Sequence, residues 1–372
     1  MARTGSIRRM MAAAVVAVAV TVPASAEAAG EAVTYGITMA PQHGKLFREA
    51  PRAVDWSISA AITAPWPASP TILPIKQIVA RFPPEMSFNP PDSMPVCPDS
   101  ILGPGVNPSL PVDEVVALCP RAVIGNGVSS IYIGRVNGPD GPNLTDPEMV
   151  MFNGGRNSRG RPVIKTYGFS KGVNAGIYMV GTLERNGEYR VSMPVLPFDS
   201  AVGAFTLSIP GTTDPHPNRR GLEPGYVMAT CSRGSWMASA QFTLGTRDNA
   251  GRPIGPDSIV VGPDLTIPCE GARGRARFGR IRVTGPRRIR SGRAARFRVS
   301  IPSIGTASAR SVRVRAMGRG IRGRAAVARI RPGVTRTLAI RVKARRSGDR
   351  RVVFRVGAAG VARRATVRLR VG

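Results

Sequence analysis

Several runs within the last hundred residues alternate strictly between apolar and basic side chains, and this alternation limits the possible folds most strongly. The clearest examples are RFRV at 296–299, VRVR at 312–315, IRVK at 340–343 and VRLRV at 367–371. Successive side chains of a β-strand point to opposite faces, so a period of two places the apolar set on one face and the basic set on the other. The pattern therefore predicts strands with a buried aliphatic face and a solvated cationic face.

Turn-forming residues separate these alternating runs at short intervals. Examples are SG at 291–292, RPG at 331–333 and SGD at 347–349. Short alternating strands with turn signals between them are typical of an antiparallel sandwich. We therefore predict a seven-stranded immunoglobulin-like β-sandwich over residues 280–372. Its strands are expected to start near residues 280, 294, 310, 323, 336, 351 and 361.

The formal net charge of +31 is carried almost entirely by this C-terminal part. Residues 271–372 hold 31 arginines or lysines and a single acid, Asp349, whereas residues 1–270 hold 22 basic and 21 acidic residues. Composition changes abruptly at a glycine-containing stretch. We therefore expect a linker over residues 271–279, which joins a nearly neutral domain at 30–270 to the basic domain at 280–372.

The N-terminus has the three parts of a secretory signal peptide. Three arginines in the first nine residues precede an apolar run over 11–22, and Ala24 and Ala26 supply an A-x-A cleavage site. The apolar run is shorter than the roughly 20 residues that a membrane-spanning helix needs. We predict a signal peptide over residues 1–26, a secreted or cell-surface location and no transmembrane segment. General and twin-arginine export both stay open.

The domain at 30–270 is also expected to consist of strands. Asn186-Gly187 lies between two alternating apolar runs within residues 180–195, which is a strong hairpin signal. The remaining segments predict a large sandwich or two packed sheets, so the fold class is all-β. These segments are 33–39, 54–64, 75–82, 128–134, 148–153, 162–169, 204–209, 225–231 and 236–244.

Four cysteines in an exported chain predict two disulfides. Four cysteines allow three pairings, and we favour the local ones, Cys97 with Cys119 and Cys231 with Cys269. No Cys-x-x-Cys pair or Cys/His cluster occurs in the sequence. We therefore expect neither a metal site nor a cofactor.

The basic domain resembles the immunoglobulin-like domains of the CARDB and NEW3 type in bacterial surface proteins. Gly305, Val312, Pro332-Gly333 and Ile340 match the pattern of those domains, while Ser303 lies near the position of their usual turn asparagine. The resemblance covers about 95 residues. It implies a sandwich fold and an adhesion or spacer role.

Most of residues 70–270 resemble a family of uncharacterised exported proteins of high-GC actinobacteria. The shared features are the Cys-Pro-x4-Gly-x-Gly segment, here Cys119 to Gly127, and a cysteine close to a tryptophan, here Cys231 and Trp236. This resemblance implies a β-rich fold and export, and it implies no activity.

The sequence provides few groups for enzymatic catalysis. His43 and His216 are the only histidines, and no nucleophile elbow, zinc-protease or phosphate-loop motif occurs. Acidic loops at 137–148 and 247–257 have the composition of turns, in which Asp and Asn bond their own backbone. Calcium binding there and a distant carboxylate pair of a glycosidase remain alternatives. We expect a protein that is not an enzyme.

The basic strand faces predict binding to a polyanion. Residues 271–372 contain no Trp or Tyr, so sequence-specific reading of nucleic acid is not expected. The first hypothesis is an exported binding or structural protein of the cell envelope that contacts an anionic wall or extracellular polymer. One alternative is an exported, for example polysaccharide-acting, hydrolase with a basic accessory domain; another is that the arginines only solvate strand faces. The oligomeric state stays open. The candidate polyanion-binding residues are Arg296, Arg298, Arg313, Arg315, Arg341, Lys343, Arg368 and Arg370.

Overall fold

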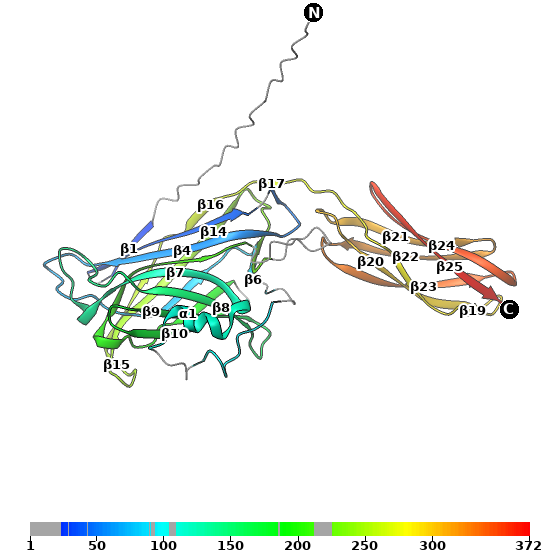
Figure 1. Cartoon of the computed structure of the whole chain (residues 1–372). Coiled ribbons are helices and arrows are strands. Elements are labelled where there is room, and N and C mark those ends of the chain that lie inside the picture. Colours follow the sequence, from blue (N-terminus) through cyan, green and yellow to red (C-terminus); the bar gives the residue numbers. More distant parts are fainter. Residues whose placement is uncertain are drawn as a thin grey trace, which may run out of the picture.

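The computed structural model shows two β-rich lobes joined along the chain (Figure 1), and the predicted all-β class is confirmed. Most of the predicted signal peptide, both histidines and Asn186 lie outside the described residues. In the described part of the chain, no helix has the length and apolar character needed to cross a membrane. The structure describes residues 24–28, 30–42, 44–88, 90, 94–103, 109–184, 187–211 and 225–372.

One long antiparallel sheet builds the first lobe. Its order is β1-β2-β4-β12-β7-β8-β9-β10-β11-β5-β14-β15, and the short strands β6 (Met86–Phe88), β13 (Val227–Ala229) and β16 (Leu265–Pro268) pair beside this path. The strands of the main path are β1 (Ala24–Ala28), β2 (Glu31–Pro41), β4 (Arg52–Thr63), β12 (Ala201–Ile209), β7 (Val123–Tyr132), β8 (Glu148–Arg156), β9 (Pro162–Ser170), β10 (Ala175–Leu183), β11 (Glu188–Ser192), β5 (Ile75–Arg81), β14 (Ser235–Arg247) and β15 (Pro253–Val261).

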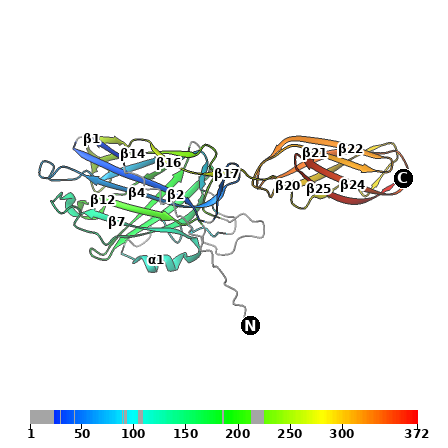
Figure 2. The ribbon, with the colours of Figure 1, turned by 90° about the horizontal axis from the view of Figure 1, so that it is seen from above.

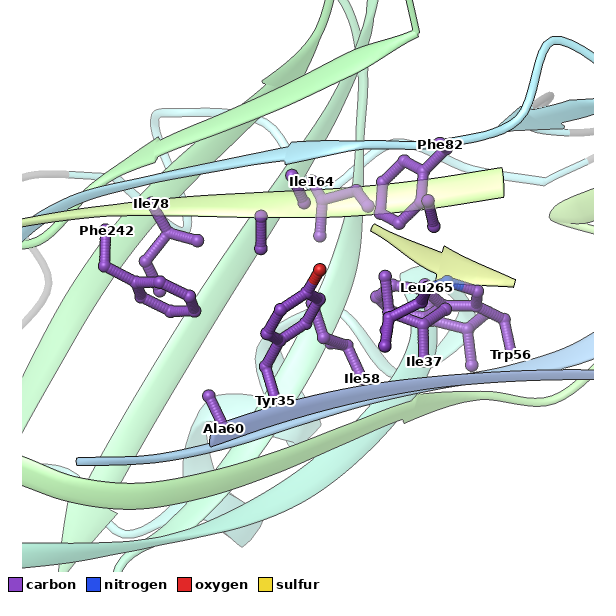
Figure 3. Packing of buried hydrophobic residues seen from close by; sticks show 14 of the residues in the cluster. Tyr35, Ile37, Trp56, Ile58, Ala60, Ile78, Phe82, Ile164, Phe242 and Leu265 are labelled. Carbon is purple, nitrogen blue, oxygen red and sulfur yellow. The ribbon is translucent and has the colours of Figure 1, made fainter. Parts of the chain in front are cut away.

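This sheet folds over on itself and encloses a large apolar core (Figure 3). Tyr35 of β2 meets Phe242 of β14 across the core, with ring centroids 6.2 Å apart. Nearby, Trp56 packs edge-on against Phe82 and Phe88, with each pair of centroids 5.7 Å apart. These contacts join strands that are distant in the sheet order, so the interior of the lobe has two opposed walls.

Strand β9 is buried over its whole length because both of its faces are covered. Helix α1 (Val112–Leu118) lies on the outside of the first lobe (Figure 2). It covers the outer face of β9 beside the Cys97–Cys119 disulfide. Lys165 of β9 is buried there, and its ammonium donates to the carbonyls of Cys97 at 2.6 Å and Leu102 at 3.0 Å. A buried lysine must satisfy its donors, so Lys165 attaches the disulfide loop to the sheet.

Both predicted disulfides are confirmed. Cys97 pairs with Cys119 and Cys231 pairs with Cys269. The acidic loop at 247–257 forms a turn around Asp248, which accepts hydrogen bonds from the amides of Ala250 and Arg252. The second half of that loop already belongs to β15, a strand that the sequence pattern did not reveal.

The second lobe has eight strands in the order β18-β20-β23-β22-β21-β24-β25-β19. Neighbouring strands are antiparallel except for the last pair, β25 and β19, which is parallel. Phe297 of β20 and Phe354 of β24 meet in its core, with centroids 5.5 Å apart. The seven longer strands lie close to the seven predicted runs, and β19 is a short addition. The strands are β18 (Arg282–Thr284), β19 (Arg288–Ile289), β20 (Ala294–Pro302), β21 (Ala309–Gly318), β22 (Ile321–Ile330), β23 (Thr335–Ala344), β24 (Gly348–Ala358) and β25 (Val361–Val371).

The lobes are joined by backbone pairing and by one acidic side chain. Strand β17 (Gly271–Ala272) pairs in parallel with β3 (Leu46–Phe47) of the first lobe. A Cβ at Gly271 would lie 1.8 Å from the carbonyl oxygen of Cys231, so only glycine fits at this crossing. The Glu49 carboxylate accepts a 2.6 Å hydrogen bond from the Ser308 amide of the second lobe.

Candidate functional site

All eight predicted polyanion-binding residues are exposed, and the structure distributes them over two opposite faces of the second lobe. Phe297 and Phe354 point toward one another in the core, so the outer faces of β20 and β24 point away from each other. The predicted residues therefore form two groups instead of one surface. Arg296, Arg298, Arg341 and Lys343 lie on the β20–β23 face, and Arg313, Arg315, Arg368 and Arg370 lie on the β21–β24–β25 face.

Four arginines lie in register across the second of these faces. Arg315 of β21 is paired with Arg324 of β22 on one side and with Arg355 of β24 on the other. Arg355 is in turn paired with Arg364 of β25. We call Arg324, Arg315, Arg355 and Arg364 the arginine row. Adjacent strands are about 4.8 Å apart, so the row spans roughly 14 Å across four strands.

Two shallow hollows flank the arginine row, and Arg355 contributes to both. One is lined by Arg313, Arg315 and the small residues at the tip of the β24–β25 hairpin. The other is lined by Met317, Val353 and Arg364. The small side chains of the hairpin leave room for the backbone of an extended ligand beside the guanidinium groups.

The described carboxylates neutralise very little of this charge. Among the described residues, Arg310 and Arg329 are the two basic residues of the second lobe that come within ion-pair distance of an acid, and both reach Glu49 at 3.5 Å. Hydrogen bonds from Ser308, together with these arginines, hold the pKa of Glu49 below its usual range. No described residue forms an ion pair with any member of the arginine row. Like charges directly opposite one another destabilise a sheet. The guanidinium groups of the arginine row therefore repel one another, and a bound anion would reduce this repulsion.

Sequence analysis identified Arg315 and missed the other three members of the row. The VFRV segment around Arg355 has the same alternation as the segments that were chosen. Membership in the row depends on strand register, however, and register is set by pairings between distant parts of the chain. The row could therefore not be assembled from spacing alone.

Comparisons with known proteins place the chain in no family. No protein-family model matches it, and no curated protein matches it. Among solved structures, it is aligned with the C-terminal domain of the Streptococcus pyogenes antigen I/II-family protein AspA at 9% identity and a TM-score of 0.20, over 90% of this chain and 98% of that one. The S-layer protein rSbsC(31-844) is aligned at 9% identity and a TM-score of 0.20, over 92% of this chain and 52% of that one.

A third alignment, to Escherichia coli alpha-2-macroglobulin, has 9% identity and a TM-score of 0.19 over 92% of this chain and 33% of that one. At such scores these likenesses carry no argument about fold or function. The site is therefore interpreted from its own geometry.

Proposed function

We propose that the second lobe binds a linear polyanion of the cell envelope and so holds an exported protein at the cell surface. An all-β chain with two disulfides is compatible with an extracellular binding or structural protein. The observation that carries the proposal is the arginine row, in which four guanidinium groups lie in register without carboxylate partners among the described residues.

The chemistry of the row favours ligands with repeated phosphate or carboxylate groups. Guanidinium groups form bidentate hydrogen bonds with both kinds of anion. A polymer that crosses the strands would meet one cation about every 4.8 Å. Binding would release condensed counterions and would weaken steeply as salt is added.

A co-sedimentation experiment tests this proposal. The full chain is mixed with isolated anionic wall polymer at 50 mM and at 500 mM salt, and the bound fraction is measured. We expect binding at low salt and release at high salt, since exposed charge contacts are screened there. Binding that does not change with salt, or no binding at low salt, contradicts the proposal.

Two double variants with the same change in charge locate the binding surface. Arg315→Gln/Arg355→Gln removes two members of the arginine row, whereas Arg296→Gln/Arg341→Gln removes two opposed arginines from the other face. We expect the first variant to lose at least tenfold in affinity and the second less than threefold. Equal losses would show that net charge, and not the row, holds the polymer.

The hydrolase alternative gains no support from the apolar cavity of the first lobe, which lies between strands β12, β7, β8, β9, β10, β11 and β5. Its lining, as far as the described residues define it, is almost entirely apolar and includes no carboxylate and no imidazole. A pair of acids or a Ser/His pair that converges on this cavity would have favoured that alternative. We therefore base the functional proposal on the second lobe.

A further inference from the structure

The first lobe contains an apolar cavity of about 100 Å³ inside the curved sheet. Seven strands that are consecutive in the sheet order, from β12 through β7, β8, β9, β10 and β11 to β5, contribute to its wall. A dry apolar cavity of about 150 Å³ is large enough to bind benzene. The present cavity is smaller than that, so its volume suits a short hydrocarbon segment. Its wall includes Ile131, Met149, Ile177, Met179, Val191 and Val202.

The space exists because β9 presents small side chains to the interior. Thr166, Gly168 and Ser170 line the cavity on alternate positions of this strand. A Cβ at Gly168 would come within 3.4 Å of Ile177 and 3.6 Å of Met149. The glycine therefore leaves free the space that a side chain would occupy between these two residues. Methionines elsewhere in the wall can adapt to ligands of irregular shape.

Several hydroxyl groups of the wall are already hydrogen-bonded within the protein. Ser129 donates to the carbonyl of Ala204 at 2.8 Å, and Ser170 donates to Asp146 at 2.7 Å. These groups offer little to a polar ligand. The cavity therefore favours the apolar part of a molecule.

A second, polar hollow adjoins the cavity, because the segment Leu196–Phe198 lines both spaces. Phe198 is 58% exposed and has a left-handed φ of 57°. Asp199 and Arg135 in the polar hollow also have left-handed φ values, 47° and 56°, and they form an ion pair at 2.9 Å. Left-handed backbone at residues other than glycine is costly and gathers at ligand sites.

Arg247 is the basic residue of this hollow that forms no ion pair with a described carboxylate. It is half-buried at the end of β14 and donates to the carbonyl of Pro194 at 3.1 Å. Asp257 pairs with Lys76 at 2.6 Å, and Asp248, which also lines the hollow, pairs with Arg252 at 2.7 Å. Burial lowers the pKa of Arg247, and the negative charge of Asp257 opposes this shift.

We propose that the cavity and the adjoining hollow bind a small anionic amphiphile, with its apolar tail among the strands of the first lobe and its head group at Arg247. A molecule of this class needs an apolar space and a cation close to one another, and the two spaces that share Leu196–Phe198 provide both. This site is separate from the arginine row and does not depend on the polyanion proposal.

Calorimetric titration of the full chain with straight-chain carboxylates, each below its micelle concentration, tests the proposal. Acetate is expected not to bind. From butanoate onward, the affinity should rise about fourfold with each added methylene, as for hydrocarbon burial, and should level off once the cavity is full. A rise that continues through dodecanoate, or no binding at any length, overturns the proposal.

Variants then separate the tail site from the head site. Ala175→Phe, or Ile177→Phe if the first variant does not fold, fills the cavity and should abolish the dependence on chain length. Arg247→Gln should reduce the affinity for the carboxylate to that for the alcohol of equal length, without changing the affinity for the alcohol. Unchanged affinities in either kind of variant contradict the proposal.

The variant Arg315→Gln/Arg355→Gln serves as the control for carboxylates that bind to the basic lobe. It should leave the chain-length dependence intact. Loss of amphiphile binding in this variant would place the carboxylates on the arginine row and refute the cavity site. Loss of polymer binding alone would leave the cavity site standing.

Discussion

Arg315 of β21 lies directly opposite Arg355 of β24, and neither guanidinium has an ion-pair partner among the described residues. Repulsion of this kind weakens the sheet, and a protein that needed the arginines only for solubility could stagger them or alternate them with acids. Here the pairing is extended on both sides, by Arg324 and Arg364. The arrangement sacrifices some stability of the second lobe for a dense line of positive charge.

Removing an arginine that has two like-charged neighbours should stabilise the protein. Arg355→Thr relieves the repulsion from Arg315 and Arg364, and we expect the free energy of unfolding to rise by about 0.5–1.5 kcal/mol at low salt. Denaturant unfolding of the second lobe measures the change. The gain should shrink at 0.5 M salt, where exposed charges are screened.

Arg313→Thr is the matched control for this prediction. Arg313 lies on the same face but is paired with Ala326 and Gly357, so its removal relieves no directly opposed charge. Its effect should be smaller than that of Arg355→Thr. Equal effects of the two substitutions would mean that strand propensity, and not opposed charge, controls the change.

Removing the buried ammonium of Lys165 should destabilise the first lobe. Lys165→Met leaves the buried carbonyls of Cys97 and Leu102 without their donor, which costs about 1–3 kcal/mol of unfolding free energy. Asp99→Asn is the contrasting variant. Its carboxylate also contacts Lys165, at 2.7 Å, but is 82% exposed, so the loss should stay below about 1 kcal/mol. A larger loss in the Asp99 variant would assign the stability to the ion pair.

The contact of Glu49 with the second lobe should depend on pH. Its pKa is lower in the folded protein than in the unfolded chain, chiefly through its hydrogen bonds with Ser308. Ionised Glu49 therefore stabilises the folded state fully above the unfolded pKa of about 4.5, and this contribution is lost as the pH falls through the lower folded value.

Thermal unfolding of the natural chain and of Glu49→Gln between pH 3 and pH 7 checks this sign. The natural chain should be the more stable of the two from pH 5 upward, and the difference should vanish toward pH 3. Glu114→Gln, on the exposed side of α1, removes the same charge and should change stability by less than about 0.5 kcal/mol at pH 7. A difference that grows toward acid pH would contradict the assignment.

The Cys97–Cys119 disulfide should contribute strongly to the stability of the first lobe. The bond closes a loop with a sequence separation of 22, and Cys97→Ala/Cys119→Ala should lower the free energy of unfolding by about 2–4 kcal/mol. Denaturant unfolding of the variant beside the oxidised natural chain measures the loss. A loss below 1 kcal/mol would show that Lys165 and the packing of α1 hold the loop without the bond.

Local features of the chain were predictable from its sequence, and features that join distant strands were not. The alternation at 312–315 located β21 because side-chain direction in a strand is fixed by the backbone itself. The pairing of Cys97 with Cys119 followed because both lie in one short stretch. By contrast, the alignment of Arg315 with Arg355 depends on how β21 and β24 are placed in the sheet.

The cavity was not predictable for the same reason. Thr166, Gly168 and Ser170 form an ordinary alternating strand in the sequence, and they enclose a space only because the sheet curves. Arg247 looked like part of a turn-rich acidic loop, and only the packing of β14 beside Leu196–Phe198 places it next to the cavity.

The position of Gly271, two residues after Cys269, has a mechanical consequence. If the second lobe is held on a surface while the first is dragged by flow, tension enters the first lobe at Gly271–Ala272. The β3–β17 pair carries it first. Should that pair separate, the Cys231–Cys269 bond transfers the tension to the beginning of β14. The segment between the two cysteines, which have a sequence separation of 38, is then not extended. The connection between the two lobes would then lengthen by only a few residues before the Cys231–Cys269 disulfide prevents further extension.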